Sequence, residues 1–453
     1  MALWSSSEIA AATQGRASDH FDVGGVAFDS REVGPGDLFV ALKGETTDGH
    51  RFVDQAFAQG AAGVLVSQPV AGPHIIVPNT TSALDAMGIA SRQRTQAKIV
   101  GVTGSVGKTS VKEALFAAFD RAAPGKAHRS LKSYNNHVGV PLSLARMPRE
   151  TKFGVFEMGM NHAGELSALT RLVRPHVALV TTVALAHGAF FADESAIADA
   201  KGEIFRGLEP GGTAIIPYDS PHRDRLIAAA MAYAGQIVTF GRDPRADVHA
   251  REGLAGPRGT FVQARLRSCE LSFTVGPPGE HWITNALAVL AVVEAAGGDI
   301  GSAGLALADM AGLPGRGRRI TIRLPDGDAL LIDEAYNANP ASMRATLAML
   351  GQESGRKVAI LGAMRELGPE ESRHHAALAD PIAAAGVDLA LLVGTEMKPL
   401  AEALEGRIDF VHVADAAAAA DQASKLIAPG DAVLVKGSNS VGLAGVVDAL
   451  AGG

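Results

Sequence analysis

The chain has 453 residues, of which 47% are apolar and 20% charged, and its formal net charge is −7. This length exceeds what one hydrophobic core usually spans, so two or three domains are expected. The 41 Lys and Arg residues are spread along the chain, which disfavours a nucleic-acid partner, and the single Cys269 excludes an intrachain disulfide framework and fits a reducing compartment.

The first 85 residues contain short apolar runs separated by Gly and Pro turns, with one helical stretch between Phe52 and Gln59. We therefore predict a small mixed α/β domain over residues 1–85. From "AKIVGVTG" onward, apolar runs of strand length alternate with helical periodicity, as in "FGVFEMG", "VALVTTV", "GTAIIP" and "QIVTFG". This alternation predicts a mostly parallel sheet with crossover helices in a central domain, residues 86–313.

The segment "AGLPGRGRR", residues 311–319, interrupts this rhythm with Gly, Pro and Arg and is typical of a linker. Beyond it the alternation resumes in "ALLIDEAY", "KVAILGA", "LALLVG" and "AVLVKGS". Residues 314–453 are therefore predicted to form a second doubly wound, Rossmann-like domain. The predicted fold class is α/β with three domains.

A loop for phosphate is predicted in "GVTGSVGKTS", residues 101–110, although Val102 occupies the place of the first glycine of a strict Walker A motif. The glycines lie between a buried strand and a helix, where backbone N–H groups and the helix N-terminus bind anions. Lys108 would neutralise phosphate, and the Thr109 hydroxyl would bind Mg²⁺. A plain strand-helix turn is the alternative. The nucleotide-binding residues predicted here are Gly104, Ser105, Val106, Gly107, Lys108, Thr109 and Ser110.

Candidate metal ligands follow two apolar runs. Glu157 comes after "FGVF", and His187 comes after "VALVTTVALA", so both are expected near the carboxyl ends of strands. Mg²⁺ prefers oxygen ligands, which favours Glu157. By itself, His187 is more typical of a packed or hydrogen-bonded histidine than of a metal ligand.

The shortened loop "TGSVGKTS" resembles that of the Mur ligase and folylpolyglutamate synthetase superfamily, whose ATP-dependent enzymes join an amine to a carboxylate. The absence of an Asn-Lys dipeptide disfavours a GTP switch. "FEMGMNHAGEL" and "LAHGAFF" resemble the superfamily segments that bind metal, which implies this role for Glu157 and His187. Lys201 in "DAKGEIF" matches a lysine that CO₂ carbamylates and that then reaches a second Mg²⁺; by itself it is typical of a surface lysine.

Other segments imply further contacts through the same resemblance. "KSYNNHVGVPLSL" places Asn135 and Asn136 beside the phosphates and the acceptor, although alone they are equally typical of a loop. "PGEHWITNALAVLA" matches a segment whose Asn, here Asn285, contacts adenine, but Trp282 departs from several relatives. The residues expected to close over ATP from the third domain and the hinge are Arg316, Asp333, Asn337 and Asn339.

The stretch from "FDSREVGPGDLF" to "GVLV" resembles the UDP-sugar-binding domain of the two later muramyl-peptide ligases, a domain that folylpolyglutamate synthetases lack. It implies that Ser30, Arg31, Lys43 and His50 contact uridine and diphosphate. Each residue alone is typical of an exposed loop.

The segment "IDEAYNANPASMRATL" resembles the branch of the superfamily that adds D-alanyl-D-alanine to a UDP-N-acetylmuramoyl-tripeptide, and it implies both compounds as substrates. Tyr336 and, in "LGAMRELGPEESRHH", His375 match substrate-side positions. Two residues depart from the pattern: Ala363 replaces an Asp and Asn439 an Arg, whose charge Lys436 could supply. The alternatives left open are a ligase that adds diaminopimelate or lysine and a nucleotide-gated binding module without chemistry.

The predicted cofactors are ATP and Mg²⁺, and the predicted protein is a cytoplasmic monomer. The first residues lack a basic segment followed by an apolar one. Uncharged stretches such as "PHVALVTTVALAHGAFFA" fall short of the ~20 apolar residues that a membrane helix needs.

Overall fold

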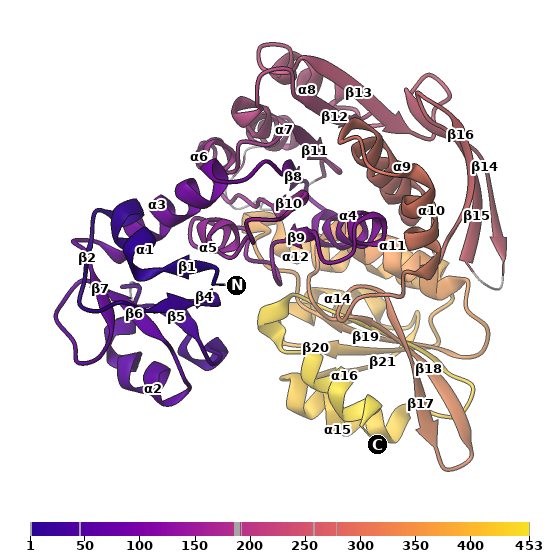
Figure 1. Ribbon diagram of the computed structural model, residues 1–453. Helices are drawn as coiled ribbons and strands as arrows, with labels where there is room; N and C mark the ends of the chain where they lie inside the picture. Colours follow the sequence, from indigo (N-terminus) through magenta and orange to yellow (C-terminus); the bar gives the residue numbers. More distant parts are fainter. Residues whose placement is uncertain are drawn as a thin grey trace.

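The structure, a computed structural model, describes residues 2–44, 47–184, 191, 193–256, 259–277 and 279–452. Within these ranges the strands form sheets of two, five, nine and six strands. The three larger sheets define an N-terminal unit (residues 4–93), a central unit (98–309) and a C-terminal unit (318–451). These units appear as three lobes in Figure 1.

The N-terminal unit is built on a small, mainly parallel sheet. Its strands are β1 (Trp4–Ser5), β2 (Arg16–Ala17), β3 (Asp22–Val23), β4 (Gly25–Ala27), β5 (Asp37–Val40), β6 (Gly63–Val66) and β7 (His74–Ile76), and its helices are α1 (Ser6–Thr13), η1 (Ser30–Glu32), η2 (Gly49–Phe52), α2 (Val53–Ala58) and α3 (Thr80–Gln93). The strand order is β2-β7-β6-β5-β4, with β2 antiparallel at the edge. Because side chains alternate along a strand, Leu38 of β5 packs with α1 and α3 whereas Phe39 packs with α2.

The central unit has nine strands in the order β16-β15-β14-β13-β12-β11-β8-β10-β9. They are β8 (Lys98–Thr103), β9 (Ala127–Arg129), β10 (Phe153–Glu157), β11 (Val177–Val180), β12 (Thr213–Pro217), β13 (Gln236–Gly241), β14 (Val248–Gly256), β15 (Gly259–Arg265) and β16 (Glu270–Val275). Strands β8 to β14 are parallel, and β15 and β16 extend the sheet through antiparallel pairs.

Helices cover both faces of the central sheet. One face carries α4 (Lys108–Ala122), α9 (Glu280–Ala295) and α10 (Ile300–Asp309), and the other carries α5 (Gly139–Ala145), α6 (Glu165–Val173), α7 (Glu194–Gly202), η3 (Glu203–Gly207) and α8 (Arg223–Ala230). Consecutive residues of β8 serve the two cores, with Val100 facing α4 and Ile99 facing α5. Apolar faces on both sides explain the continuous apolar run that the sequence shows there.

The C-terminal unit repeats this design with six strands in the order β17-β18-β22-β19-β20-β21. The strands are β17 (Arg318–Leu324), β18 (Gly327–Glu334), β19 (Lys357–Gly362), β20 (Leu389–Val393), β21 (Asp409–Val413) and β22 (Ala432–Lys436). Only β17 is antiparallel, in a hairpin with β18. The helices are α11 (Pro340–Gly351), η4 (Gly368–Glu370), α12 (Glu371–Ala376), α13 (Ala379–Ala384), η5 (Thr395–Met397), α14 (Lys398–Leu404), α15 (Ala416–Leu426), η6 (Asn439–Val441) and α16 (Ala444–Ala451).

The N-terminal and central units share a core. Leu142 and Ala145 of α5 belong to the same apolar cluster as Trp4 and Leu84 of the N-terminal unit. The indole N–H of Trp4 also donates to the Ala145 carbonyl at 2.8 Å. This shared packing fixes the N-terminal unit against the central sheet (Figure 1).

The predicted fold class, α/β with parallel sheets in a three-part architecture, is confirmed. The predicted domain boundaries stay predictions, and α3 runs across the one placed at residue 85. The sequence analysis did not anticipate strands β14 to β16. Residues of β15 and β16 alternate in burial, as in an antiparallel sheet with one solvated face, and the described residues of β14 after Ala250 are exposed, so these strands lack the continuous apolar runs of the inner strands.

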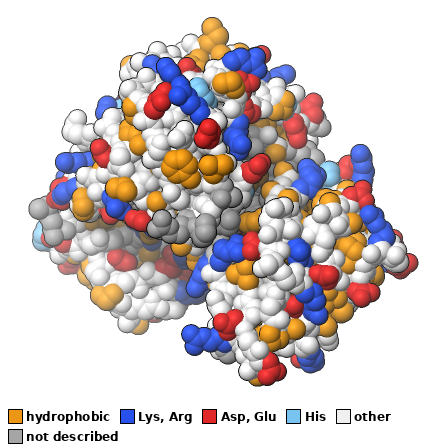
Figure 2. All heavy atoms as spheres, turned by 90° about the vertical axis from the view of Figure 1, so that its right-hand side faces the viewer, with side chains coloured by type: hydrophobic (Ala, Val, Ile, Leu, Met, Phe, Trp, Pro, Cys, Tyr) orange, Lys and Arg blue, Asp and Glu red, His pale blue; other side chains and the backbone are white. Residues whose placement is uncertain are grey.

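Charged side chains of both signs are intermingled on the face of the molecule in Figure 2. Among the helices in the described ranges, none combines the length and the apolar character that crossing a membrane requires.

Candidate nucleotide site

Residues 104–110, here called the phosphate loop, connect the end of β8 to the start of α4. Gly104 has a φ of +153°, and a Cβ at this position would lie 1.9 Å from Thr181 Oγ1. Gly107 has a φ of +87° and precedes the helix, whose first N–H groups receive no side-chain cap. Position 104 therefore requires glycine, because the backbone has a positive φ and there is no room for a Cβ. The uncapped start of the helix leaves N–H donors available for an anion.

The segment after β11 holds the phosphate loop in place. Thr181 donates its hydroxyl to the Val106 carbonyl at 2.6 Å, and Ser105 donates its hydroxyl to the Ala184 carbonyl at 2.8 Å. These bonds tie the loop to the neighbouring strand end, so that the backbone donors are fixed before a ligand arrives.

Lys108 and Thr109 begin α4 and face two different groups. The Lys108 ammonium donates to the Gly104 carbonyl at 2.5 Å, and the Thr109 hydroxyl donates to Glu157 Oε2 at 2.8 Å. Burial lowers the pKa of Lys108; Glu157 opposes this shift and Arg316 adds to it. A cation that already loses hydration in this place gains from a phosphate beside it.

Glu157 is the last residue of β10, the neighbour of β8 in the sheet, and only 1% of it is exposed. Asn135 donates its side-chain amide to Glu157 Oε1 at 2.9 Å. The parallel register brings Glu157 beside Val102, one strand away from the phosphate loop. The predicted neighbourhood of Glu157, Asn135 and Thr109 is therefore present.

A cavity of about 760 Å³ lies between the central and C-terminal units. Phosphate-loop residues, Glu157, Lys201 and Asn285 line it from the central unit. The residues from the hinge and the C-terminal unit that line it include Arg316, Glu334, Tyr336, Asn337, Asn339, Lys436 and Ser438. A cavity of this size, with polar groups converging on it, is the usual form of a small-molecule site.

Lys201 lies at the end of α7 and is 2% exposed. Burial, and then the charge of Lys108, lower the pKa of Lys201 well below its ordinary value. This shift favours the neutral amine, the form that a reacting lysine requires.

The C-terminal side of the cavity is organised by short local contacts. The Arg316 guanidinium lies 4.3 Å from the centre of the Tyr336 ring. Asn339 caps α11 by accepting from the Ser342 N–H at 2.9 Å. Lys436 Nζ lies 3.3 Å from Glu334 Oε2 and donates to the Asn337 carbonyl at 2.8 Å.

Three predicted residues have other surroundings. Asp333 does not line the cavity: its carboxylate accepts from the Gly315 N–H at 2.6 Å and so shapes the hinge, and burial raises its pKa. Asn136 accepts from the Gly139 N–H at 2.9 Å at the start of α5. His375 is fully buried, and its Nε2 accepts from the Met364 N–H at 2.9 Å. Each supports a loop at the cavity rather than its wall.

The four residues predicted to bind uridine and diphosphate belong to the N-terminal unit and lie outside the 760 Å³ cavity. Ser30 donates to Gln55 at 3.1 Å, and Arg31 pairs with Asp29. His50 binds Asp48 through Nδ1 at 2.6 Å and accepts from the Ser67 N–H at 2.9 Å. Lys43 is exposed. The prediction for His187 falls outside the described residues.

The sequence analysis missed several cavity residues, among them His281, Glu334 and Arg365. Glu334 could have been found, because it ends β18 as Lys436 ends the adjacent β22, and the two residues are opposite each other in the register. The two departures also lie together: the Ser438 N–H, next to Asn439, donates to the Ala363 carbonyl at 3.0 Å. Ala363 and Asn439 therefore lie close to each other, and Asn439 lines the cavity.

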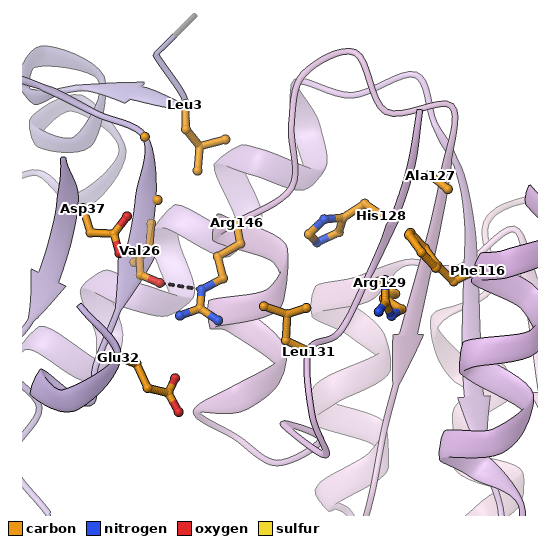
Figure 3. A pocket seen from close by; sticks show the side chains of 12 residues that line it. Leu3, Val26, Glu32, Asp37, Phe116, Ala127, His128, Arg129, Leu131 and Arg146 are labelled. Atoms are coloured by element: carbon orange, nitrogen blue, oxygen red, sulfur yellow. Dashed lines mark hydrogen bonds between the residues drawn. The ribbon is translucent and has the colours of Figure 1, made fainter. Parts of the chain in front are cut away.

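A second cavity, of about 540 Å³, lies between the N-terminal and central units (Figure 3). Glu32 and Asp37 line it from one side and Arg129 and Leu131 from the other, and Arg146 donates to the Val26 carbonyl across it at 2.5 Å. It contains neither the phosphate loop nor Glu157. The candidate nucleotide site is therefore the larger cavity.

The fold and the larger cavity, of about 760 Å³, define a nucleotide-dependent ligase. Three family models match the chain: Mur ligase family, catalytic domain, over residues 22–87; Mur ligase middle domain over 102–293; and Mur ligase, glutamate ligase domain, over 318–439. The chain belongs to the Mur ligase family, a family of ATP-dependent ligases.

Particular relatives narrow the comparison. The UDP-N-acetylmuramoyl-tripeptide–D-alanyl-D-alanine ligase of Escherichia coli (strain K12) is 36% identical over 430 residues, which are 94% of this chain and 93% of the relative. A crystal structure of MurF from Acinetobacter baumannii is 31% identical, with a TM-score of 0.85 and 99% of both chains covered. The structure of MurF ligase from Thermotoga maritima in complex with ADP is 25% identical, with a TM-score of 0.77, and covers 94% of this chain and 97% of that one.

Proposed function

We propose that this protein joins D-alanyl-D-alanine to UDP-N-acetylmuramoyl-tripeptide in an ATP-dependent reaction. The names of the full-length relatives support this assignment. The observation that carries it is the cavity in which the phosphate loop, Glu157 and Lys201 face Asn337, Asn339 and Lys436 across the two units. Such a cavity can hold a nucleotide between the loop and a second clamp.

ATP would lie with its β- and γ-phosphates on residues 104–110 and its base near Asn285, whose Oδ1 lies 3.0 Å from the place of a Cβ at Gly107. Lys108 would neutralise phosphate charge, and the helix N-terminus would supply N–H donors. Arg316, Asn337 and Asn339 would close the site from the other unit, while Asp333 would hold the hinge.

The donors at the site suit Mg²⁺, because Thr109 and Glu157 offer oxygen atoms held 2.8 Å apart. The described residues contain no group of three or more His, Cys, Asp or Glu side chains that could hold a metal alone, which fits an ion bound largely by phosphate and water. Bound Mg²⁺ supplies positive charge at the transferring phosphoryl group. His187 and a carbamylated Lys201 complete the ligand set that the resemblance implies.

The Lys201 ammonium would first lose a proton, and its neutral amine would then add to CO₂, forming an N–C bond and releasing a second proton, so that a buried cation becomes an anion. Its low pKa and its 2% exposure support this step. Without it, the resting site would hold two lysines close enough to affect each other's ionisation.

The terminal carboxylate of the tripeptide would attack the γ-phosphorus, forming an O–P bond as the bond to ADP breaks. The amine of the dipeptide would then attack the acyl phosphate carbon, and phosphate would leave with the electron pair while the amine loses a proton. An α-amine has a pKa of ~8, so no strong base is needed. Asn135, Asn136, Tyr336 and His375 are the proposed acceptor-side residues, directly or through their loops.

The N-terminal unit would hold the UDP end of the substrate through Ser30, Arg31, Lys43 and His50. Their polar groups lie on η1, η2 and the adjoining loops. We further propose that the protein acts in the cytoplasm as a monomer.

The product mass tests the assignment. Incubation with ATP, Mg²⁺, UDP-N-acetylmuramoyl-tripeptide and D-alanyl-D-alanine should give a product whose mass is the sum of the tripeptide substrate and the dipeptide minus one water. One ADP should be released for each product formed. Parallel incubations with diaminopimelate or lysine should release no ADP. ADP release with one of these amino acids instead would assign the alternative ligase activity, and no ADP in any arm would leave a binding module.

A further inference from the structure

Lys112 is a fully buried lysine on α4 that the proposed reaction does not use, and 0% of it is exposed. It lies one helical turn beyond Lys108 and does not line the nucleotide cavity. Lysine is almost never fully buried unless it is paired, so its partners decide what it does.

The Lys112 ammonium contacts three groups. It donates to the Lys132 carbonyl at 2.6 Å, and it lies 3.2 Å from Glu113 Oε1 and 3.7 Å from Glu157 Oε2. The Glu157 carboxylate therefore has Thr109, Asn135 and Lys112 around it, and Lys112 brings the only full charge among them. Thr109 and Asn135 line the cavity, where a ligand could contact them, whereas Lys112 does not.

The Lys132 carbonyl belongs to a segment of the central unit, residues 130–135, that contacts both Glu157 and the N-terminal unit. Asn135 at its end donates to Glu157, and Lys132 and Tyr134 bind Glu32 of the N-terminal unit. Glu32 and Leu131 face each other across the smaller cavity in Figure 3. The Lys112 ammonium therefore contacts both the 130–135 segment, through the Lys132 carbonyl, and the Glu157 carboxylate.

We propose that Lys112 is a positioning residue of the ligase: it fixes the Glu157 carboxylate and the 130–135 segment together, so that Glu157 is oriented for the metal that accompanies ATP. Groups behind a metal ligand set its orientation and basicity. Lys112 fits this part because it contacts Glu157, which lines the cavity, without lining the cavity itself. The inference rests on the proposed nucleotide and metal site but does not depend on which amine is the acceptor.

Two substitutions and one control test the proposal. Lys112→Met removes the charge and the donor, and Lys112→Gln keeps an amide donor for the Lys132 carbonyl but removes the charge. The control is Glu113→Gln, which alters the other partner of Lys112 and the pairing with Arg129 while leaving the Lys112–Glu157 contact in place.

The quantity measured is the affinity of the full-length protein for Mn²⁺ in the presence of ADP. Electron paramagnetic resonance detects the Mn²⁺. Both Lys112 variants should bind Mn²⁺ about 10- to 100-fold more weakly than the wild type, the range typical of changes behind a metal ligand. Binding of ADP without metal should be unchanged in all variants, and Glu113→Gln should keep the wild-type Mn²⁺ affinity.

Wild-type Mn²⁺ affinity in both Lys112 variants, even with a lowered melting temperature, would make Lys112 a structural residue and overturn the proposal. Equal weakening in Glu113→Gln would also overturn it. If the wild type itself fails to bind Mn²⁺ with ADP, the proposed nucleotide function fails, which separates that outcome from failure of the role of Lys112.

Discussion

Replacement of Gly104 by alanine tests whether the phosphate loop needs a glycine for geometric reasons. The added Cβ would meet Thr181 Oγ1 at 1.9 Å, and Thr181 is held by its bond to the Val106 carbonyl. Alanine at a positive φ costs about 1–2 kcal/mol, and overpacking in a closed site costs about 1–3 kcal/mol more. We expect Gly104→Ala to lower the free energy of unfolding by about 2–5 kcal/mol.

The loop should lose function for the same reason, because relief of the clash moves the backbone donors. Loss of one net hydrogen bond to phosphate, about 1.4 kcal/mol, weakens ATP binding about tenfold. Urea unfolding and calorimetric titration with ATP measure the two effects. The matched control is Gly211→Ala, where φ is +79° and nothing lies within 4 Å of the added Cβ. Equal stability loss and equal ATP affinity in the two variants would refute the reasoning.

Three further predictions concern charged and polar groups of the site. Burial keeps the pKa of Lys201 well below 10.5, so the unfolded state binds more protons and wild-type stability rises with pH toward that value. In CO₂-free buffer, Lys201→Met should therefore be more stable than the wild type at pH 7, but inactive. The difference in the free energy of unfolding between the two proteins should shrink as pH rises. A difference that does not change with pH would contradict this prediction. Thr109→Val should reduce the ligation rate about 10- to 100-fold and raise the Mg²⁺ concentration needed, as measured by ADP release, and an unchanged Mg²⁺ dependence would count against Thr109 as a ligand. Lys436→Met should lower the free energy of unfolding in urea by about 3–5 kcal/mol because it leaves Glu334 unpaired. The double variant with Glu334→Gln should recover much of this loss. Additive losses would show that the pair is not coupled.

The sequence alone predicted the parts of the site that local chemistry defines. A glycine loop between a buried strand and a helix has few other conformations, so Gly104, Gly107 and Lys108 could be assigned without tertiary information. Continuous apolar runs predicted the parallel strands, because both faces of those strands are covered. Glu157 was predicted because sites in such sheets form at the carboxyl ends of strands, and Glu157 ends β10, the neighbour of the strand that precedes the phosphate loop.

Other assignments depended on contacts between residues far apart in the chain. Asp333 and His375 match cavity positions in their motifs, but hydrogen bonds to Gly315 and Met364 make them supports of loops. Strands β14 to β16 were missed because they lack the continuous apolar runs of the inner parallel strands, and the burial of residues in β15 and β16 alternates instead. Neither feature can be read from the spacing of residues.

The sequence by itself predicted two layered α/β units and a glycine loop suited to phosphate, because strand burial and glycine conformation are local properties. Only the tertiary structure decided that Lys436 and Arg316 face that loop across a cavity, and that Lys112 lies behind Glu157. Those arrangements depend on how separate sheets and helices pack, and the distances that result set the charge and hydration of each group.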